Sequence, residues 1–283
     1  MSSDLPFTKG PDTIASVISL WRYPVKSMMG EELATVDLTE RGLLGDRQYA
    51  LIDAGTGKVA SAKNPRKWAT LFDCRATFVQ RPSAASHAPR IQITLPDGTT
   101  VTSDQNDVAA QLSKAFGREV RLASTAPANP TLEEYWPPVE GLPHSDIVTD
   151  EAIPSAAFFD SAPLHLLTSA TLDQLTALYP AGRFEPRRFR RNIYMTLSAR
   201  DSGFVENGWI GRTLCIGEHV QLDITGPCPR CVMTTLPQGD LPQDLNVLQT
   251  AVKANQGGVG IYATVRRGGT IRRHGVARTR GAS

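Results

Sequence analysis

Short runs of apolar and β-branched residues, broken by glycine, proline and aspartate, form the main pattern along the first half of the chain. These runs predict strands at residues 13–22, 33–38, 48–53, 71–78 and 91–95. Turn residues separate them, as in AGTG after the third run and PDG after the fifth. Short strands spaced by turns favour a barrel or a sandwich over a parallel sheet. One helix is expected at residues 107–116, where apolar residues recur at helical spacing and Gly117 provides a stop.

The second half continues this mixture of short strands and occasional helices. Strands are predicted at residues 164–167, 192–196, 209–216 and 219–224. A helix is predicted over SATLDQLTALY, with Ser169 as its cap. The VMTT run after the last cysteine favours a further strand, and GVG at Gly258 indicates a turn.

Residues 124–159 differ from the rest because they carry six prolines and few periodic patterns. We interpret this stretch as a connector lying over the surface. A chain of 283 residues is long for a single core. We therefore expect two domains, residues 1–129 and residues 130–283. The expected fold class is mainly β, with two β-barrel-like parts and a few peripheral helices.

Composition narrows the class of protein. The net charge is only +2, with 41% hydrophobic and 20% charged residues, which argues against a generally basic nucleic-acid binder. Four scattered cysteines are too few for a secreted disulfide framework. The first residues lack the pattern of a signal peptide, and no apolar run approaches the ~20 residues of a spanning helix. A cytoplasmic protein without a membrane partner is the expectation.

Two of the cysteines, Cys228 and Cys231, stand at C-x-x-C spacing in TGPCPRCVMTT. A structural zinc site usually needs four ligands, and a second C-x-x-C or histidine pair is missing. A thioredoxin-like pair normally begins a helix, whereas a strand is predicted here. A pair of buried, inert cysteines is the third interpretation. The fourth is a thiolate ligand for a bound cofactor, with Arg230 beside it, because thiolates bind soft or redox-active metals.

The run RFEPRRFRR at residues 183–191 places five arginines in nine positions. A solvated basic face is the simplest interpretation, but two interleaved phenylalanines indicate that some of these side chains are held inward. The guanidinium fork matches phosphate and carboxylate groups, so an anionic ligand is the sharper interpretation. Nucleic acid is a third alternative, although no recognised binding motif accompanies the run. Lys26, Ser27 and Arg47 lie in predicted loops and add groups suited to phosphate.

Several separated stretches together resemble the MOSC family, named after the C-terminal domain of molybdenum cofactor sulfurases. LWRYPVKSMMGEEL and RGLLGDRQYALID are similar to the β-barrel domain that precedes MOSC domains. DSAPLHLLT, RFRRNI, FVENGWIGRTLCIG and CPRCVMTT are similar to the MOSC domain itself. The resemblance covers about residues 13–265 in order. The layout is similar to that of the amidoxime-reducing components and their bacterial relatives.

The resemblance implies a molybdenum cofactor (Mo-molybdopterin) bound between the two parts. Cys231 is implied as the metal-binding thiolate on molybdenum and as the catalytic residue. The implied cofactor contacts are Lys26, Ser27, Arg47, Ser161, Arg190, Asn192, Arg230 and Cys231. This set is chemically consistent, because a pterin dithiolene with a terminal phosphate needs cationic donors and its metal needs a soft ligand.

The implied function is a molybdenum-dependent oxidoreductase that reduces small N-hydroxylated compounds. The sequence offers neither the cysteines of an iron–sulfur cluster nor a glycine-rich dinucleotide fingerprint after a strand. Electrons are therefore expected from a separate donor protein, such as a ferredoxin, a flavodoxin or a cytochrome with its reductase. The alternative is a cofactor or sulfur carrier, in which Cys231 is the acceptor thiol. Nucleic acid is not an expected partner.

Overall fold

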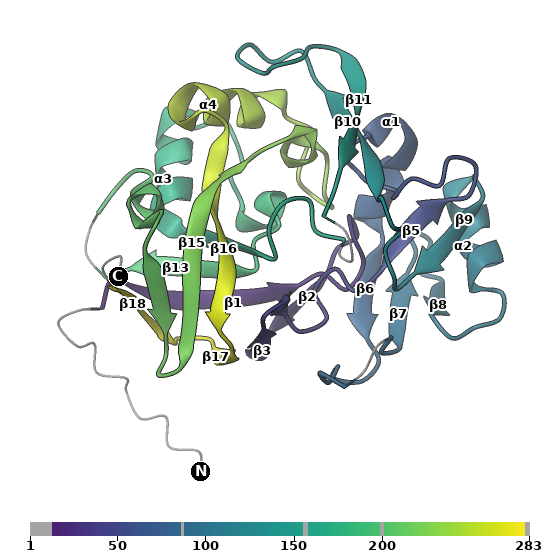
Figure 1. Ribbon diagram of the computed structural model, residues 1–283. Coiled ribbons are helices and arrows are strands. Elements are labelled where there is room, and N and C mark those ends of the chain that lie inside the picture. Colours follow the sequence, from purple (N-terminus) through teal and green to yellow (C-terminus); the bar gives the residue numbers. More distant parts are fainter. Residues whose placement is uncertain (1–12, 86–87, 155–157, 199–200, 281–283) are drawn as a thin grey trace.

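A closed barrel of seven strands occupies the half of the molecule that Figure 1 shows on the left. The computed structural model describes residues 13–85, 88–154, 158–198 and 201–280. Around the barrel the strands follow the order β13, β12, β16, β15, β14, β18 and β1, and β1 closes the ring by pairing with β13. Their bounds are β1 (Ala15–Arg22), β12 (Leu164–Thr168), β13 (Ile193–Leu197), β14 (Thr213–Ile216), β15 (Val220–Pro229), β16 (Gly258–Arg267) and β18 (Val276–Arg280). Every pairing in the ring is antiparallel except that of β12 with β13.

Strand β1 comes from the start of the chain and completes a barrel built otherwise from the second half. Its Ala15, Val17 and Leu20 side chains are buried in the barrel core, and a register shift between Val17 and Ser19 changes which side chains point inward. The strand therefore lies before the expected domain boundary and pairs with strands that follow it. The boundary near residue 130 itself stays a prediction.

The N-terminal lobe, residues 49–123, stands beside the barrel and has a separate core (Figure 1). It contains a three-stranded sheet, a two-stranded sheet and two helices: β6 (Arg75–Phe78), β7 (Ile91–Thr94), β8 (Thr100–Thr102), β5 (Ala50–Asp53), β9 (Val120–Ala123), α1 (Pro65–Trp68) and α2 (Val108–Phe116). Helix α2 confirms the predicted helix, and Gly117 ends it in the left-handed conformation. The predicted strand at residues 71–78 is shorter than expected, because a 3₁₀ turn occupies Ala69–Asp73.

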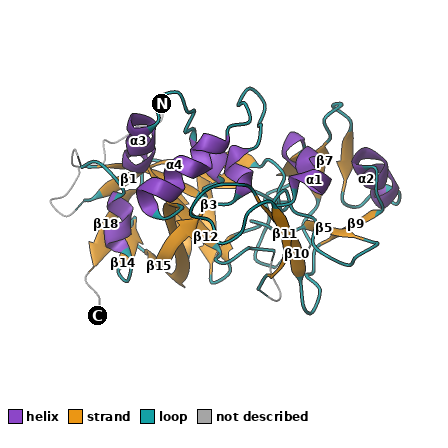
Figure 2. Cartoon of the chain, turned by 90° about the horizontal axis from the view of Figure 1, so that it is seen from above, coloured by secondary structure: helices purple, strands orange, loops and turns teal. Residues whose placement is uncertain are grey.

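The remaining elements cover the barrel. Strands β3 (Thr35–Thr39), β4 (Gly42–Leu43) and β17 (Gly269–Arg272) form a small sheet whose apolar side chains join the barrel core, and β2 (Glu31–Leu33) pairs with β1. Helices α3 (Ser169–Leu178) and α4 (Leu245–Asn255) share an apolar cluster with Leu167 and Val259. Figure 2 shows these two helices over the barrel and α1 and α2 over the N-terminal lobe. The mainly β class is confirmed, with four short α-helices in the described part of the chain.

The predicted surface connector contains a structured hairpin, so that interpretation was incomplete. Strands β10 (Thr131–Trp136) and β11 (Ile147–Ala152) pair over six residues each, and Figure 1 shows them rising between the two lobes. The prolines that concealed this pattern flank the strands or lie in the loop between them.

Three local predictions in the second half were wrong. The VMTT run forms a 3₁₀ turn, Val232–Thr235, because it follows the barrel strand and turns back so that Val232 and Met233 pack into the core of the N-terminal lobe. The GVG stretch begins strand β16 instead of forming a turn. Helix α3 is capped by the side chain of Thr168, which accepts a hydrogen bond from the Thr171 amide, and not by Ser169.

We expect Gly260→Ala to lower the free energy of unfolding by about 3 kcal/mol or more. Gly260 has φ +78°, and a Cβ there would overlap the His165 ring and the Leu166 carbonyl, so strand β16 lies against β12 only with glycine at this position. Gly217→Ala is the matched control: its φ is +64° but a Cβ would meet nothing within 4 Å, so only about 1 kcal/mol of backbone strain is expected. Urea unfolding of both variants measures the difference. Equal losses would contradict a close approach of β16 to β12.

Candidate functional site

A cavity of about 780 Å³ lies where the barrel, the N-terminal lobe and the β10–β11 hairpin meet. This is within the usual size range of sites for small molecules and cofactors. All the residues that the sequence singled out as cofactor contacts line it: Lys26, Ser27, Arg47, Ser161, Arg190, Asn192, Arg230 and Cys231. The cavity therefore brings together side chains from both halves of the chain, and their roles toward a ligand stay predictions.

The backbone of the cavity wall is held in an unusual conformation at several points. Ser27, Arg47, Arg190 and Gln256 line the cavity with φ values of 64°, 46°, 51° and 51°. Only six non-glycine residues in the described part of the chain have positive φ, so four of them gather here. Such conformations cost free energy and persist where the surrounding structure imposes them, commonly at functional sites.

Arg190 forms the cationic end of the cavity together with Arg47. The two guanidinium carbons lie 4.2 Å and 4.6 Å from the centre of the Tyr23 ring. Arg190 donates to the Met28 carbonyl at 2.7 Å, whereas its Nη2 is buried without a hydrogen-bond partner. Burial, with the like charge of Arg47, lowers the pKa of Arg190 to about 10, so it remains charged at neutral pH. A buried donor without a partner favours an anionic acceptor inside the cavity.

The amide of Asn192 is fully used within the protein. Its Oδ1 accepts hydrogen bonds from the His165 amide at 3.1 Å and from Arg47 at 3.4 Å. Its Nδ2 donates to the Trp21 carbonyl at 3.2 Å and to Asp46 at 3.1 Å. An asparagine amide has two donors and an acceptor with two lone pairs. Asn192 therefore positions Arg47 and ties β1 to the cavity, with no donor of its amide left for a ligand.

A chain of ion pairs crosses the cavity floor toward the hairpin. Lys26 donates to the Phe158 carbonyl at 2.9 Å and pairs with Asp160. Lys63 lies 3.6 Å from Asp160 and 2.9 Å from Glu134. Burial outweighs Asp160 and lowers the pKa of Lys26, whereas for Lys63 the carboxylates outweigh burial and the pKa is raised. Lys26 is therefore already engaged by protein groups at the position where the sequence placed a cofactor contact.

Arg230 is held by uncharged groups. It donates to the Val259 carbonyl at 2.8 Å and 3.1 Å and to the Phe189 carbonyl at 3.0 Å. Its Nη2 also lies 2.8 Å from Nε2 of His165 and contacts the Cys228 sulfur. Burial, with Arg230 beside it, holds the pKa of His165 well below its usual range, so this imidazole is neutral at pH 7. Among the described residues no carboxylate pairs with Arg230, and its charge is available to a ligand.

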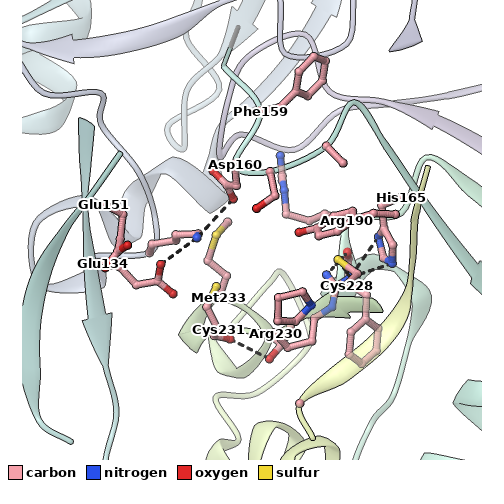
Figure 3. Close-up of a pocket in the computed structure, with 18 of the residues that line it drawn as sticks. Glu134, Glu151, Phe159, Asp160, His165, Arg190, Cys228, Arg230, Cys231 and Met233 are labelled. Atoms are coloured by element: carbon pink, nitrogen blue, oxygen red, sulfur yellow. Dashed lines mark hydrogen bonds and ion pairs between the residues drawn. The ribbon is translucent and has the colours of Figure 1, made fainter. Parts of the chain in front are cut away.

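Cys231 lies between strand β15 and the 3₁₀ turn that follows, and its partly buried side chain faces the cavity (Figure 3). Burial raises the pKa of its thiol to about 12, although the charge of Lys63 opposes this. A metal ion would displace the proton, since coordinated thiols are bound as thiolates. The part of the chain that the structure describes contains no group of three metal-binding side chains, so a protein-only zinc site has no ligand set here.

The balance of charge in the cavity favours an anion. Six cationic side chains and three carboxylates line it. The arginine run contributes unevenly: Arg183 and Arg187 form surface ion pairs with Glu185 and Asp240, while Arg188 donates to backbone carbonyls. Arg190 alone of these contributes a buried, unpaired donor to the cavity wall.

Several cavity residues carried no signal in the sequence. Lys63 lies between two predicted strands and Glu134 lies in the predicted connector, and their pairing depends on the hairpin folding back onto the N-terminal lobe. His165 belongs to the DSAPLHLLT stretch, but its burial under Arg230 follows from the approach of β16. Asp160, in the same stretch, acquires its role from Lys26, which is 134 positions away.

We expect Asp160→Asn to lower the free energy of unfolding of the cofactor-free protein by about 2 kcal/mol at pH 7, because Lys26 would stay buried without its counter-charge. Burial raises the pKa of Asp160, but Lys26 and Lys63 lower it by more, so it lies well below the usual range. A depressed carboxyl pKa stabilises the fold in full above the unfolded-state value of about 3.9, and this stabilisation is lost progressively as the pH falls from there toward the lower pKa of the folded state. The difference between variant and wild type should therefore begin to shrink below about pH 5 and keep shrinking as the pH is lowered further.

Asp150→Asn is the control for this comparison, since Asp150 forms an exposed pair with Lys58 and its removal should cost less than about 1 kcal/mol. Urea unfolding at each pH gives both differences. A loss for Asp160→Asn that does not change down to pH 3 would show that the carboxylate charge is not its cause.

Comparison with known proteins finds two family domains that follow each other along the chain. The family described as the MOSC N-terminal beta barrel domain matches residues 14–120, and the MOSC domain matches residues 154–275. Mitochondrial amidoxime reducing component 2 of Rattus norvegicus is 21% identical over 243 residues, which cover 79% of this chain and 67% of the relative. Mitochondrial amidoxime-reducing component 1 of Homo sapiens is 24% identical over 235 residues, covering 79% and 66%. The matched region is thus about two thirds of each relative's length.

The crystal structure of the YUAD protein from Bacillus subtilis matches 94% of both chains at 12% identity and a TM-score of 0.46.

Within the described residues, no helix has the length and apolar character needed to cross a bilayer. The two domain matches follow each other along the chain in the order that the sequence motifs predict. The resemblance is thereby confirmed: the chain belongs to the MOSC family, with an N-terminal MOSC β-barrel domain followed by a MOSC domain.

Proposed function

We propose that this protein holds the molybdenum cofactor in the cavity between its two parts and works as an oxidoreductase on small N-hydroxylated compounds. One observation carries the proposal: cationic side chains from both halves and the Cys231 thiol line a single cavity. MOSC domains are associated with the molybdenum cofactor, and two relatives are named for reducing amidoximes. An amidoxime is an N-hydroxylated amidine, which gives the substrate class.

The donor set fits this cofactor. Its terminal phosphate requires cationic hydrogen-bond donors, and the buried Nη2 of Arg190 lacks a partner in a wall that also contains Arg47. Its metal requires a soft ligand, and Cys231 supplies a thiol facing the same space. Arg230, held only by carbonyls, His165 and Cys228, offers a further charge near that thiol. The cofactor residues proposed are Arg47, Arg190, Arg230 and Cys231, with Lys26, Ser27 and Ser161 also lining the cavity and Asn192 as a positioning residue.

When bound, the cofactor supplies two-electron chemistry that removes oxygen from the substrate. Reduction of an N-hydroxyl group breaks the N–O bond and releases water, which consumes two electrons and two protons. In the protein, Lys63 places its positive charge near Cys231 and favours the thiolate, while Asp160 and Glu134 balance that charge. The neutral His165 ring packs against Arg230 and fixes its direction.

The two electrons are proposed to come from a separate protein. Cys74 and Cys215, the cysteines outside the cavity, lie in the N-terminal lobe and in strand β14 and are far short of a cluster ligand set. The electrons must reach a cofactor held in the cavity, and basic side chains of residues 183–191 or of residues 266–280 are proposed to steer an acidic donor toward it. A donor should therefore approach the cavity mouth.

We expect Cys231→Ser to abolish molybdenum retention and turnover, because a serine hydroxyl is a poor, harder replacement for a thiolate ligand. Cys228→Ser should leave much of both, since the Cys228 sulfur is buried and accepts from Arg230. Metal analysis of both variants measures molybdenum retention, and assays with reduced viologen as the electron source measure turnover. Equal damage from the two substitutions would favour a disulfide or a shared metal site. Bound sulfane sulfur on Cys231 without molybdenum would favour the carrier function.

Turnover of an N-hydroxylated substrate should depend on the electron source. The purified protein should work with reduced viologen, fail with a nicotinamide alone, and work again with nicotinamide plus a donor protein and its reductase. The reason is that the described chain offers no dinucleotide site of the glycine-rich type between a strand and a helix, GVG being part of strand β16. Measuring substrate reduction under the three conditions tests this, and turnover with nicotinamide alone would refute the separate donor.

A further inference from the structure

The β10–β11 hairpin forms one wall of the cavity and lies outside both matched domains. The domain matches end at residue 120 and resume at residue 154, whereas the hairpin occupies residues 131–152. Its Glu134, Trp136 and Glu151 line the cavity. A wall that neither domain family provides is the part of the site in which this chain's own selectivity is expected.

One face of the hairpin fastens it to the N-terminal lobe. Glu133 pairs with Lys67 at 2.7 Å, and Asp150 pairs with Lys58 at 2.6 Å. Just beyond the strands, Asp146 pairs with Arg66 at 2.6 Å. Because side chains alternate along a strand, these contacts leave the other face directed to the cavity. The hairpin is thereby held as a fixed wall.

The cavity face of the hairpin carries a carboxylate without a counter-charge. Of the three carboxylates that line the cavity, Glu134 pairs with Lys63, and Asp160 pairs with Lys26 and Lys63. Glu151 has no cationic partner among the described residues. Its Oε1 accepts a hydrogen bond from the Thr149 hydroxyl at 2.7 Å, and this leaves Oε2 for a ligand.

Trp136 is tied to the same carboxylate. Its Nε1 donates to the Thr149 hydroxyl oxygen at 2.7 Å, and that hydroxyl donates to Glu151. These two hydrogen bonds fix the half-buried Trp136 indole beside the Glu151 carboxylate on one face of the hairpin. Thr149, which links them, lies opposite Glu134 in the β10–β11 pairing. An aromatic face and a carboxylate side by side suit a flat group that carries positive charge.

The two ends of the cavity have opposite character. Figure 3 shows Glu134 and Glu151 on one side and Arg190 and His165 on the other, with Cys231 between them. An anionic cofactor at the arginine end would leave the hairpin end for the substrate. We infer that Glu151 is a specificity-determining residue, which selects substrates with a positively charged group, while Trp136 provides a flat surface for their aromatic part.

This inference rests on the proposed function only for the reaction, because the binding of a charged ligand is measurable without turnover. The probe is benzamidinium, a flat aromatic cation that cannot be reduced at an N–O bond. Calorimetry on the purified full chain should give a dissociation constant about tenfold higher for Glu151→Gln than for wild type, or about 1.4 kcal/mol. Glu140→Gln is the matched control: it removes the same charge from the exposed loop of the hairpin and should bind like wild type.

Turnover with reduced viologen provides the second readout. Benzamidoxime and its para-trimethylammonium derivative are compared on the wild type and on both variants. Glu151→Gln should lower kcat/KM about tenfold for the charged substrate, mainly through KM, and less than twofold for the uncharged one. Equal effects on the two substrates, or unchanged benzamidinium binding in Glu151→Gln, would overturn the inference. If wild type reduces neither substrate but Glu151→Gln weakens benzamidinium binding, the proposed reaction fails while the role of Glu151 stands.

Discussion

The pairing of β1 with β13 is the contact on which the cavity depends. At its end the Trp21 amide donates to the Asn192 carbonyl at 2.8 Å, and the Asn192 side chain returns a hydrogen bond to the Trp21 carbonyl. The chain continues from β1 directly into Lys26 and Ser27, and Arg190 lies two residues before Asn192. The pairing of β1 with β13 therefore places Lys26 and Ser27 from the first half of the chain close to Arg190 from the second half. Ser27, Arg47 and Arg190, which have left-handed backbone conformations, all line the cavity at this junction.

Charge gives the cavity its direction. Arg47 and Arg190 are crowded onto one aromatic ring at one end. Burial, with the like charge of Arg47, lowers the pKa of Arg190, and Nη2 of Arg190 has no hydrogen-bond partner. Burying like charges together costs free energy, so an arrangement of this kind is stable only when other groups compensate it. Asp46 compensates it in part, by pairing with Arg47. A bound anion would complete the compensation and stabilise the folded protein by an amount that grows with the logarithm of its concentration relative to its dissociation constant.

Much of the fold and the site followed from local sequence. Turn residues and β-branched runs predicted the strands, whereas the family resemblance implied the eight side chains that line one cavity. The errors arose where tertiary contacts override local preference. VMTT has strand propensity, yet it turns because Val232 and Met233 pack into the core of the N-terminal lobe. The hairpin was concealed by flanking prolines, and with it the pairs of Lys63 and the carboxylate of Glu151. Ion pairs between residues so far apart in sequence cannot be inferred from spacing.

The closed barrel also joins the two halves of the chain through strand β1. The strand that closes it precedes the N-terminal lobe, and Val232 and Met233 from the cysteine loop belong to the core that includes that lobe. Movement of the lobe relative to the barrel would therefore displace the segment that carries Cys231. A ligand that contacts both the N-terminal lobe and the barrel would resist such movement. Cofactor binding would therefore make the contact between the lobe and the barrel more rigid.

The central claim is that the cavity holds the molybdenum cofactor, and the stoichiometry of the wild-type protein tests it most directly. Full-length protein purified from a host that makes the cofactor should contain close to one molybdenum and one pterin per chain, both lost together on denaturation. Folded protein that contains neither, or molybdenum without pterin, would contradict the account.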